Sequence, residues 1–321
     1  MDQKIVGLPA GFRDILFDEA RKRRSCEATL STLFAEAGFQ EILPSAIEFN
    51  ELYARGHQAV RRSTFRFLDR EDNLLALRAD FTPAIARIVA GRQAGGRDVH
   101  RVWYTGNVFR KVDAHQGLFC EFGQIGAELI GMPAPEGDGT VIDLALQALD
   151  RLGINEVQLH LNHAGIFRGL IHSLEMDRIA LRSVKAEIGR KDSRGLARRL
   201  EGLGVSREIQ EQLNLLSGLV GDAKVLRQAE SVLRNDESRK AVDELAVLAS
   251  RLTRWQSVIT FDLAEIDEME YYTGSMFAIV SPKLKNELGK GGRYDALLGA
   301  FGSDLPAVGF SFVTERLIQL V

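Results

Sequence analysis

The stretch RVWYTGNVFRKVDAHQGLFCEFGQIGAELIG, residues 101–131, decides the fold of this chain. Two segments with apolar residues at alternate positions, 102–109 and 118–129, flank a polar connection at 111–117. Alternation of this kind around a polar turn is typical of two paired antiparallel strands. The sequence therefore predicts a long β-hairpin here.

Four polar residues interrupt the apolar sequence of this hairpin: Arg110, Glu121, Gln124 and Glu128. Because strand residues an even number apart share a face, Gln124 and Glu128 should point to the same side of the sheet. An arginine, an amide and a carboxylate on one face suit a small zwitterionic ligand. A solvated sheet face is the commoner arrangement, and the hairpin alone favours it.

Composition narrows the class of protein. A chain of 321 residues, 45% hydrophobic and 26% charged, is typical of a globular protein long enough for two domains. No window approaches the roughly 18 to 20 apolar residues of a membrane span, and the N-terminal sequence lacks the features of a secretory signal. We therefore expect a cytoplasmic protein without a membrane partner.

Charge and cysteine content exclude two further classes of function. The net charge of −3 argues against a large nucleic-acid-binding surface, so no nucleic-acid partner is expected. Cys26 and Cys120 are too few and too far apart for a disulfide framework or a structural zinc site. We expect no metal.

The residues before the hairpin predict a helix, a strand and a smaller hairpin. Residues 18–38 carry one apolar stripe at helical spacing. Residues 39–43 read as a strand that Pro44 stops, which places it at an edge or an interface. The segments 64–68 and 74–78 flank a polar turn and predict a second hairpin.

The second hairpin leads into LRADFTP, which brings Asp80 and Thr82 to the start of a predicted helix. Pro83 suits the first turn of that helix, because its missing N–H has no partner to lose there. Thr82 at such a position is more often a helix cap than a ligand contact.

The residues after the long hairpin change in character. A Pro- and Gly-rich loop at 131–139 precedes a predicted helix at 140–152 and a strand at 157–161. Residues 166–254 read as almost entirely helical, and we interpret them as an inserted helical module. This region is rich in Arg and Lys, but Asp and Glu are interspersed and no aromatic residues are available for base stacking. Solvated helices are therefore favoured over a nucleic-acid surface.

Strand patterns return near the C-terminus, at 258–263, 271–280 and 306–312. Between them GKGGRYD, residues 289–295, lacks the spacing of a phosphate-binding P-loop. Its glycines are better suited to let the backbone approach a ligand or a neighbouring strand.

Four of these motifs in this order resemble the catalytic domain of histidyl-tRNA synthetase: the hairpin 108–131, EYYTG at 270–274, GGRYD at 291–295 and PAVGFSFVTERL at 306–317. The resemblance implies an α+β class II synthetase fold, an antiparallel sheet flanked by helices, usually dimeric. The strand before Pro44 would be motif 1, the long hairpin motif 2, and the last strand and helix motif 3.

The same resemblance implies three parts of the chain. Residues 1–165 would form the first part of the synthetase-like domain, 166–254 the helical insertion, and 255–321 the second part. The sequence ends at Val321, which leaves no room for an anticodon-binding domain of about 90 to 100 residues. A truncated sequence would explain this equally well.

Five positions depart from the residues that the enzyme uses for ATP and adenylation: Val112, Leu118, Cys120, Asp267 and Val313. They replace, in turn, a glutamate, two loop arginines, an arginine and a glycine, although Arg316 matches the motif 3 arginine. Adenylation builds negative charge on the α-phosphate, and losing one donor that stabilises such charge raises the barrier by about 3 to 4 kcal/mol. The resemblance therefore implies that synthetase activity is lost and that no residue here is catalytic.

The amino-acid half of the family's site is better retained. Asp80 and Thr82 stand where the family binds the amino group of its ligand. Arg110 can meet a carboxylate, and Gln124 with Glu128 can engage imidazole or ammonium nitrogens. The residues that the resemblance assigns to a histidine site are Asp80, Thr82, Arg110, Gln124, Glu128, Tyr271 and Tyr272.

A chain that keeps a histidine pocket but lacks the residues for adenylation resembles the regulatory subunits of ATP phosphoribosyltransferase, which are related to the synthetase. That family implies a short catalytic subunit as partner, L-histidine as effector, a homodimer within a hetero-oligomer, and no cofactor. Two alternatives stay open: an active histidyl-tRNA synthetase or tRNA-independent amino-acid-adenylating enzyme, and a scaffold whose pocket is vestigial.

Overall fold

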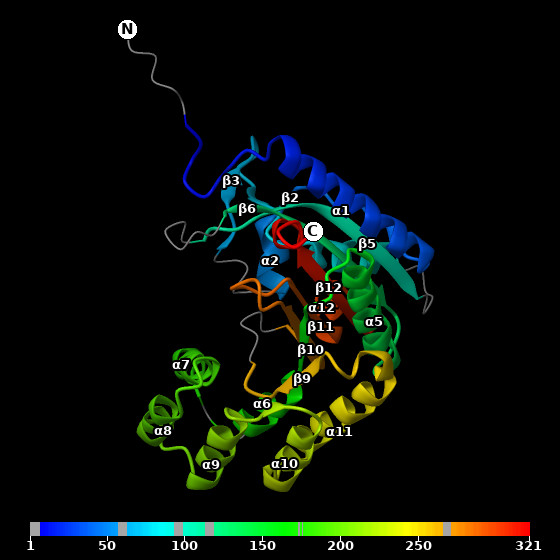
Figure 1. Ribbon diagram of the computed structural model, residues 1–321. Helices are drawn as coiled ribbons and strands as arrows, with labels where there is room; N and C mark the ends of the chain where they lie inside the picture. Colours follow the sequence, from blue (N-terminus) through cyan, green and yellow to red (C-terminus); the bar gives the residue numbers. More distant parts are fainter. Residues whose placement is uncertain are drawn as a thin grey trace.

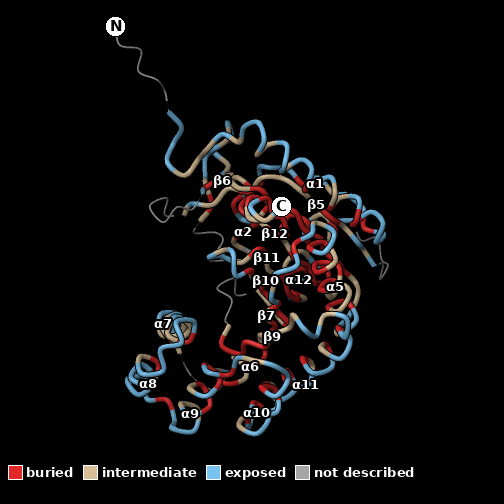
Figure 2. Tube along the Cα trace, in the orientation of Figure 1, coloured by how far each residue is buried: buried red, intermediate tan, exposed pale blue. Residues whose placement is uncertain are grey.

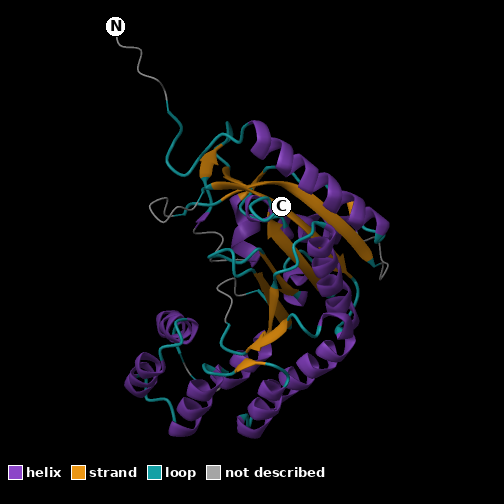
Figure 3. Ribbon diagram, in the orientation of Figure 1, coloured by secondary structure: helices purple, strands orange, loops and turns teal. Residues whose placement is uncertain are grey.

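The computed structural model describes residues 7–56, 63–92, 99–112, 119–172, 174, 176–265 and 271–321. Within them, nine strands form one mixed sheet with helices against both faces (Figures 1 and 3). In spatial order the strands are β1 (Gln40–Glu41), β5 (His100–Phe109), β6 (Glu121–Ile130), β12 (Ala307–Val313), β11 (Gly289–Arg293), β10 (Ser275–Val280), β7 (Gln158–His163), β9 (Ile259–Asp262) and β8 (Val220–Gly221).

The predicted long hairpin is confirmed as β5 and β6. Its register runs over ten antiparallel pairs, from His100 opposite Ile130 to Phe109 opposite Glu121. The alternation along β6 separates two environments. Ile125, Ala127 and Leu129 belong to one hydrophobic core, and the even-numbered side chains, including Gln124 and Glu128, face the other side, as the sequence predicted.

The expectation of an antiparallel sheet holds for six of the eight neighbouring pairs, because β1 pairs with β5, and β7 with β9, in parallel. Parallel neighbours require a long crossover connection. The helical residues between β7 and β9 supply that crossover. The sequence pattern could not reveal it, since apolar alternation within a strand carries no information on strand direction.

Each face of the sheet has its own hydrophobic core. On one face α1 (Phe17–Glu36) and α5 (Glu136–Arg151) pack over the hairpin. On the other face α4 (Thr82–Arg92) and α12 (Asp295–Gly299) pack against Tyr104 and Val108. Figure 2 shows the buried backbone concentrated between these layers.

A second, three-stranded sheet lies beside α4. Its strands are β2 (Ile47–Phe49), β4 (Leu74–Leu77) and β3 (Arg66–Leu68), with α2 (Asn50–Gly56) following β2. The pairing of β3 with β4 confirms the predicted smaller hairpin. The last element, α13 (Thr314–Leu317), follows β12 directly.

The long helical stretch is also confirmed. It contains α6 (Ala164–Ile171), α7 (Arg178–Gly189), α8 (Ser193–Gly202), α9 (Arg207–Leu216), α10 (Lys224–Val232), α11 (Asp236–Arg251) and the turn η2 (Thr253–Trp255). Figure 1 shows α7 to α10 at the end of the molecule away from α1. The division of the chain into three parts stays a prediction. No helix in the described ranges has the length and apolar character of a membrane span.

Two predicted boundaries were wrong. The helix expected at 140–152 begins at Glu136, because Asp138 in its first turn is fixed by a buried ion pair with Arg293. The strand expected at 271–280 begins only at Ser275. The tyrosines of EYYTG precede that strand, and their rings are available to a pocket instead of to the sheet.

Candidate functional site

A small pocket lies on the sheet face opposite α1, and glycines form part of its floor. Glu128 on β6 pairs with Gly309 on β12, which pairs with Gly292 on β11. A Cβ atom at Gly309 would overlap the Glu128 carboxylate, and one at Gly292 would lie 2.8 Å from the Tyr272 ring. The absence of side chains at these two positions lets larger groups sit above the strands.

Five of the seven residues assigned to a histidine site share this pocket. The enclosed space is about 20 Å³, enough for about one water molecule. An amino acid therefore enters only if lining side chains move, as interface side chains commonly do on binding. The described residues that line the pocket are Asp80, Thr82, Glu128, Tyr271, Tyr272, Lys290, Tyr294, Gly309, Phe310 and Ser311.

Glu128 is the centre of the pocket's hydrogen bonds. Its side chain is fully buried, and it accepts hydrogen bonds from Thr82 Oγ1 at 2.8 Å and from the Tyr294 hydroxyl at 2.6 Å. The Tyr104 hydroxyl is farther away, at 3.4 Å. Burial, with a smaller contribution from the charge of Asp80, raises the pKa of Glu128 to about 8 against the opposing effect of these hydroxyls. At neutral pH Glu128 is therefore mostly protonated.

Asp80 supplies a second buried carboxyl. Its Oδ1 accepts the Phe81 N–H at 2.8 Å, and its Oδ2 has no hydrogen-bond partner among the described residues. Burial raises the pKa of Asp80, and the Arg110 guanidinium, with Nη2 3.9 Å from Oδ1, opposes this. An unpartnered buried acceptor beside Glu128 favours a ligand that brings a donor or a positive charge.

The structure places Arg110 and Gln124 outside the lining of this pocket. The backbone of Arg110 bonds to Cys120, eight residues before Glu128 along β6, which is roughly 26 Å at about 3.3 Å per residue. The Arg110 side chain reaches back to the edge of the pocket, where Nε donates to the Ala79 carbonyl at 2.7 Å and Nη2 lies 3.9 Å from Asp80 Oδ1. Gln124 is buried, and its Oε1 has no partner among the described residues.

A larger cavity of about 550 Å³ lies beside the pocket, and Arg110 lines it together with Arg316. Val112 and Val313, two of the positions where the resemblance predicts that synthetase residues are replaced, also form its wall. A valine at 313 takes up more space than a glycine would, yet a cavity of this size remains. Its other described lining residues are Arg13, Glu19, Phe119, Phe122, Lys283, Leu284, Lys285, Asn286, Glu315 and Gln319.

Several cations of this cavity already have carboxylate partners. Arg13 Nη1 donates to Glu19 at 2.9 Å, and Arg316 lies 3.5 Å from Glu287. Cys120, a third replaced position, is buried, and its backbone N–H donates to the Gly11 carbonyl at 2.6 Å. Of the remaining replaced positions, Leu118 and Asp267 fall outside the described residues.

Sequence reasoning missed three residues of the site: Tyr104, Lys290 and Tyr294. The GKGGRYD motif was recognised as a place where the backbone approaches a ligand, and it contains two of the three. The missing information was the register. Only the pairing of β11 with β12, and of β12 with β6, puts Lys290 on the same sheet face as Glu128.

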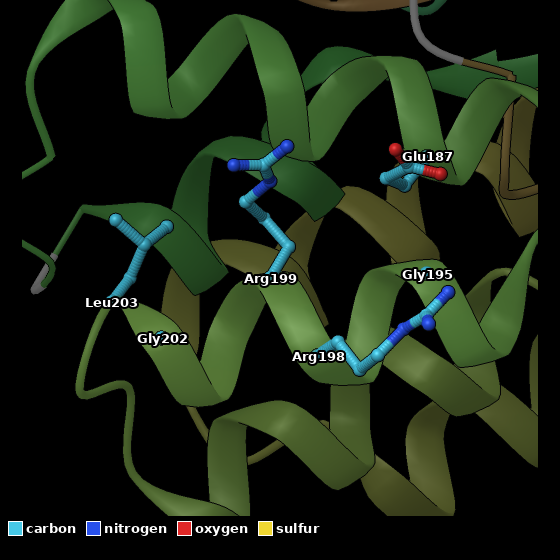
Figure 4. A pocket seen from close by; sticks show the side chains of 6 residues that line it. All are labelled: Glu187, Gly195, Arg198, Arg199, Gly202 and Leu203. Carbon is cyan, nitrogen blue, oxygen red and sulfur yellow. The ribbon is translucent and has the colours of Figure 1, made fainter.

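A second concave surface lies between α7 and α8 (Figure 4). It has a volume of about 410 Å³ and is lined by Glu187, Gly195, Arg198, Arg199, Gly202 and Leu203. Figure 4 shows Glu187 on α7 across the groove from the two arginines on α8. These arginines are exposed. Opposite charges side by side on exposed helices agree with the solvated surface expected here.

The fold and the pocket define a histidyl-tRNA synthetase-like protein of class II architecture, and the family model described as histidyl-tRNA synthetase matches residues 11–317. Curated relatives narrow this further. A protein of Geobacter metallireducens is 35% identical over 97% of this chain and 73% of its own length, and one of Thermoanaerobacter is 30% identical over 97% and 82%. Both are named ATP phosphoribosyltransferase regulatory subunit, and the chain belongs to this family.

Solved structures agree with the fold. A Bacillus halodurans protein described as an ATP phosphoribosyltransferase regulatory subunit/histidyl-tRNA synthetase has a TM-score of 0.88 at 27% identity, covering 100% of this chain and 84% of its own. A histidine–tRNA ligase subunit of Alicyclobacillus acidocaldarius has a TM-score of 0.84 at 28% identity, covering 98% and 97%. Histidyl-tRNA synthetase from Nostoc, at 20% identity and a TM-score of 0.81, covering 98% and 74%, shares the fold.

Proposed function

We propose that this chain is a noncatalytic regulatory subunit that a short ATP phosphoribosyltransferase catalytic subunit requires for the first step of histidine biosynthesis, and that it binds L-histidine as feedback effector. The observation that carries the proposal is the buried acidic pocket built around Glu128 and Asp80. The catalytic subunit is proposed as partner because the curated relatives are named ATP phosphoribosyltransferase regulatory subunit.

The chemistry of the pocket supports, as ligand, an amino acid with an ammonium group and a side-chain nitrogen. Two buried carboxyl groups are unfavourable without a positive partner. A ligand ammonium beside Asp80 would provide one, and an imidazole nitrogen could bond to Glu128. Tyr271 and Tyr272, whose rings lie 4.5 Å apart, offer an aromatic wall for the imidazole.

The neighbouring cavity supports the loss of synthetase activity. Catalysis of adenylation requires cations free to stabilise charge that develops on a phosphate. Here Arg13 and Arg316 have carboxylate neighbours within the protein, and Val112 and Val313 replace polar and small residues in the wall.

Feedback requires two states of the assembly with different affinity for the effector. The pocket suggests what distinguishes them. The pocket is nearly filled by its own side chains, so histidine binding must widen it. We propose that this widening is what the catalytic subunit senses.

Two measurements test the proposal. Isothermal titration should detect L-histidine binding that Glu128→Ala weakens at least tenfold and that Arg199→Ala, in the distant α8 groove, leaves unchanged. Purified chain should also activate a short catalytic subunit, and histidine should reduce that activity in the wild type but not in Glu128→Ala. Activation that resists histidine in the wild type would contradict the feedback role and favour a scaffold with a vestigial pocket.

An active synthetase is the second candidate, because the cavity beside the pocket remains open and keeps Arg110 and Arg316. Histidine-dependent exchange of pyrophosphate into ATP distinguishes the two. Exchange above background that disappears in Arg316→Ala would establish adenylation and overturn the noncatalytic proposal. The proposal expects no exchange.

A further inference from the structure

We infer that the pocket prefers an amino acid with a free carboxylate, and that Lys290 is the side chain that binds this carboxylate. The inference rests on the proposed histidine site and adds a residue that determines its specificity. Lys290 is the second residue of β11, and its side chain is 42% exposed at the edge of the pocket.

The strand register places Lys290 opposite the acidic end of the pocket. Lys290 pairs with Ser311 on β12, and Ser311 pairs with Gly126 on β6. Glu128 is two residues from Gly126 on the same face. Two strand spacings and two residues along a strand separate the Cα atoms of Lys290 and Glu128 by about 12 Å. A small amino acid can bridge this distance between the two side chains.

Small residues, Gly126, Gly309 and Ser311, occupy the sheet positions that separate Lys290 from Glu128. The Tyr104 side chain lies over Gly126 and the Glu128 carboxylate over Gly309, so a ligand reaches this surface when these two side chains move. Ser311 and Gly309 line the pocket. A ligand lying across this surface would therefore have its ammonium near the two acids and its carboxylate near Lys290, with opposite charges meeting at both ends.

The other cations nearby each have a carboxylate neighbour within the protein. Arg293 is buried and bound to Asp138, with Nη2 2.5 Å from Oδ2, and its Nη1 lies 3.0 Å from Asp295. Arg110 lines the neighbouring cavity, donates to the Ala79 carbonyl and has its Nη2 3.9 Å from Asp80 Oδ1. Among the described residues that line the pocket, Lys290 is the cationic side chain.

A ligand carboxylate would compete with Glu287 for the Lys290 ammonium group. The Nζ of Lys290 lies 3.5 Å from Glu287 Oε1, and the two side chains are 42% and 32% exposed. An ion pair that stays this accessible to solvent contributes modestly to stability. A ligand carboxylate held by the rest of the pocket would compete well with Glu287 for the ammonium group.

Titration calorimetry with two ligands tests this role. The ligands are L-histidine and L-histidinol, in which an uncharged hydroxymethyl group replaces the carboxylate. We expect the wild type to bind histidine at least tenfold more tightly than histidinol. Lys290→Met should lower histidine affinity about tenfold and leave histidinol affinity unchanged, and Lys290→Arg should restore most of the discrimination.

The controls separate specificity from folding and from the proposed function. Arg199→Met, on the exposed face of α8, should change neither affinity. If Lys290→Met lowers the affinity for both ligands equally, or for neither, Lys290 does not bind the carboxylate. The inference is then overturned, while the histidine site stands. If the wild type binds neither ligand, the histidine site itself is refuted together with this inference.

Discussion

The Tyr294 hydroxyl donates a 2.6 Å hydrogen bond to Oε2 of Glu128, which joins the residue after β11 to the open end of the long hairpin. Both side chains are almost completely buried. This contact links the GGRYD motif to the acidic centre of the pocket, although 166 residues separate them in the sequence.

Removing this hydroxyl should weaken the fold. Tyr294→Phe leaves a buried carboxyl oxygen without its donor, and we expect the free energy of unfolding to fall by about 1 to 3 kcal/mol. Tyr104→Phe is the matched control, since its hydroxyl is 3.4 Å from the same carboxyl group and should contribute less. Urea denaturation of both variants measures the difference. Equal losses would mean that the short hydrogen bond of Tyr294 contributes no more to stability than the longer contact of Tyr104.

The raised pKa of Glu128 makes stability depend on pH. The unfolded chain ionises this group near its ordinary pKa of 4.5, whereas the folded protein keeps the proton until about pH 8. Within that window the unfolded state binds fewer protons, so the contribution of Glu128 to stability is full below pH 4.5 and falls as the pH rises to about 8. At ~1.4 kcal/mol per pKa unit, the loss is up to ~5 kcal/mol.

Glu128→Gln, which cannot ionise, isolates this effect. Urea unfolding from pH 5 to pH 8 should show stability that declines more steeply in the wild type than in the variant. Because both proteins share all other titrating groups, the difference between the two curves reports Glu128 alone. Parallel curves would show that the pKa of the buried carboxyl is not raised.

A buried ion pair fixes the start of α5 to the end of β11. Arg293 and Asp138 are each less than 5% exposed, and Nε and Nη2 of Arg293 both donate to Asp138 Oδ2. Asp138→Ala leaves the buried guanidinium with Asp295, whose side chain is 44% exposed, as its remaining carboxylate neighbour, and we expect a loss of about 3 kcal/mol. Lys283→Ala removes an exposed pair with Glu156 and should change stability by less than ~1 kcal/mol. Thermal denaturation of both variants tests the contrast.

The hairpin and the retained pocket residues were predictable for a physical reason. Period-two alternation fixes the faces of a strand, so Glu128 and Gln124 could be placed on one side before the structure was known. Asp80 and Thr82 were predicted at a helix start, and α4 does begin at Thr82. These inferences depended on residues close together in the sequence.

The partners of Glu128 and the separation of the two cavities were not predictable. Lys290 and Tyr294 reach the pocket only through the order of β6, β12 and β11 in the sheet, which no local pattern encodes. Arg110 was grouped with Glu128 because both belong to one hairpin. Arg110 instead lines the neighbouring cavity and approaches the pocket only through Asp80, with Nη2 3.9 Å from Oδ1.

Gly309 should be essential to the pocket, because the Glu128 carboxylate occupies the place that a Cβ atom would take. Gly309→Ala would push Glu128 away from Thr82 and Tyr294, and overpacking of this kind lowers stability by about 1 to 3 kcal/mol. We also expect loss of histidine binding. Gly91→Ala in α4 is the matched control, since nothing lies within 4 Å of its Cβ position and alanine favours a helix by about 1 kcal/mol. Calorimetry and urea unfolding of the two variants should give opposite changes in stability, and a Gly309→Ala protein that binds histidine normally would show that the Glu128 carboxyl can move without affecting the site.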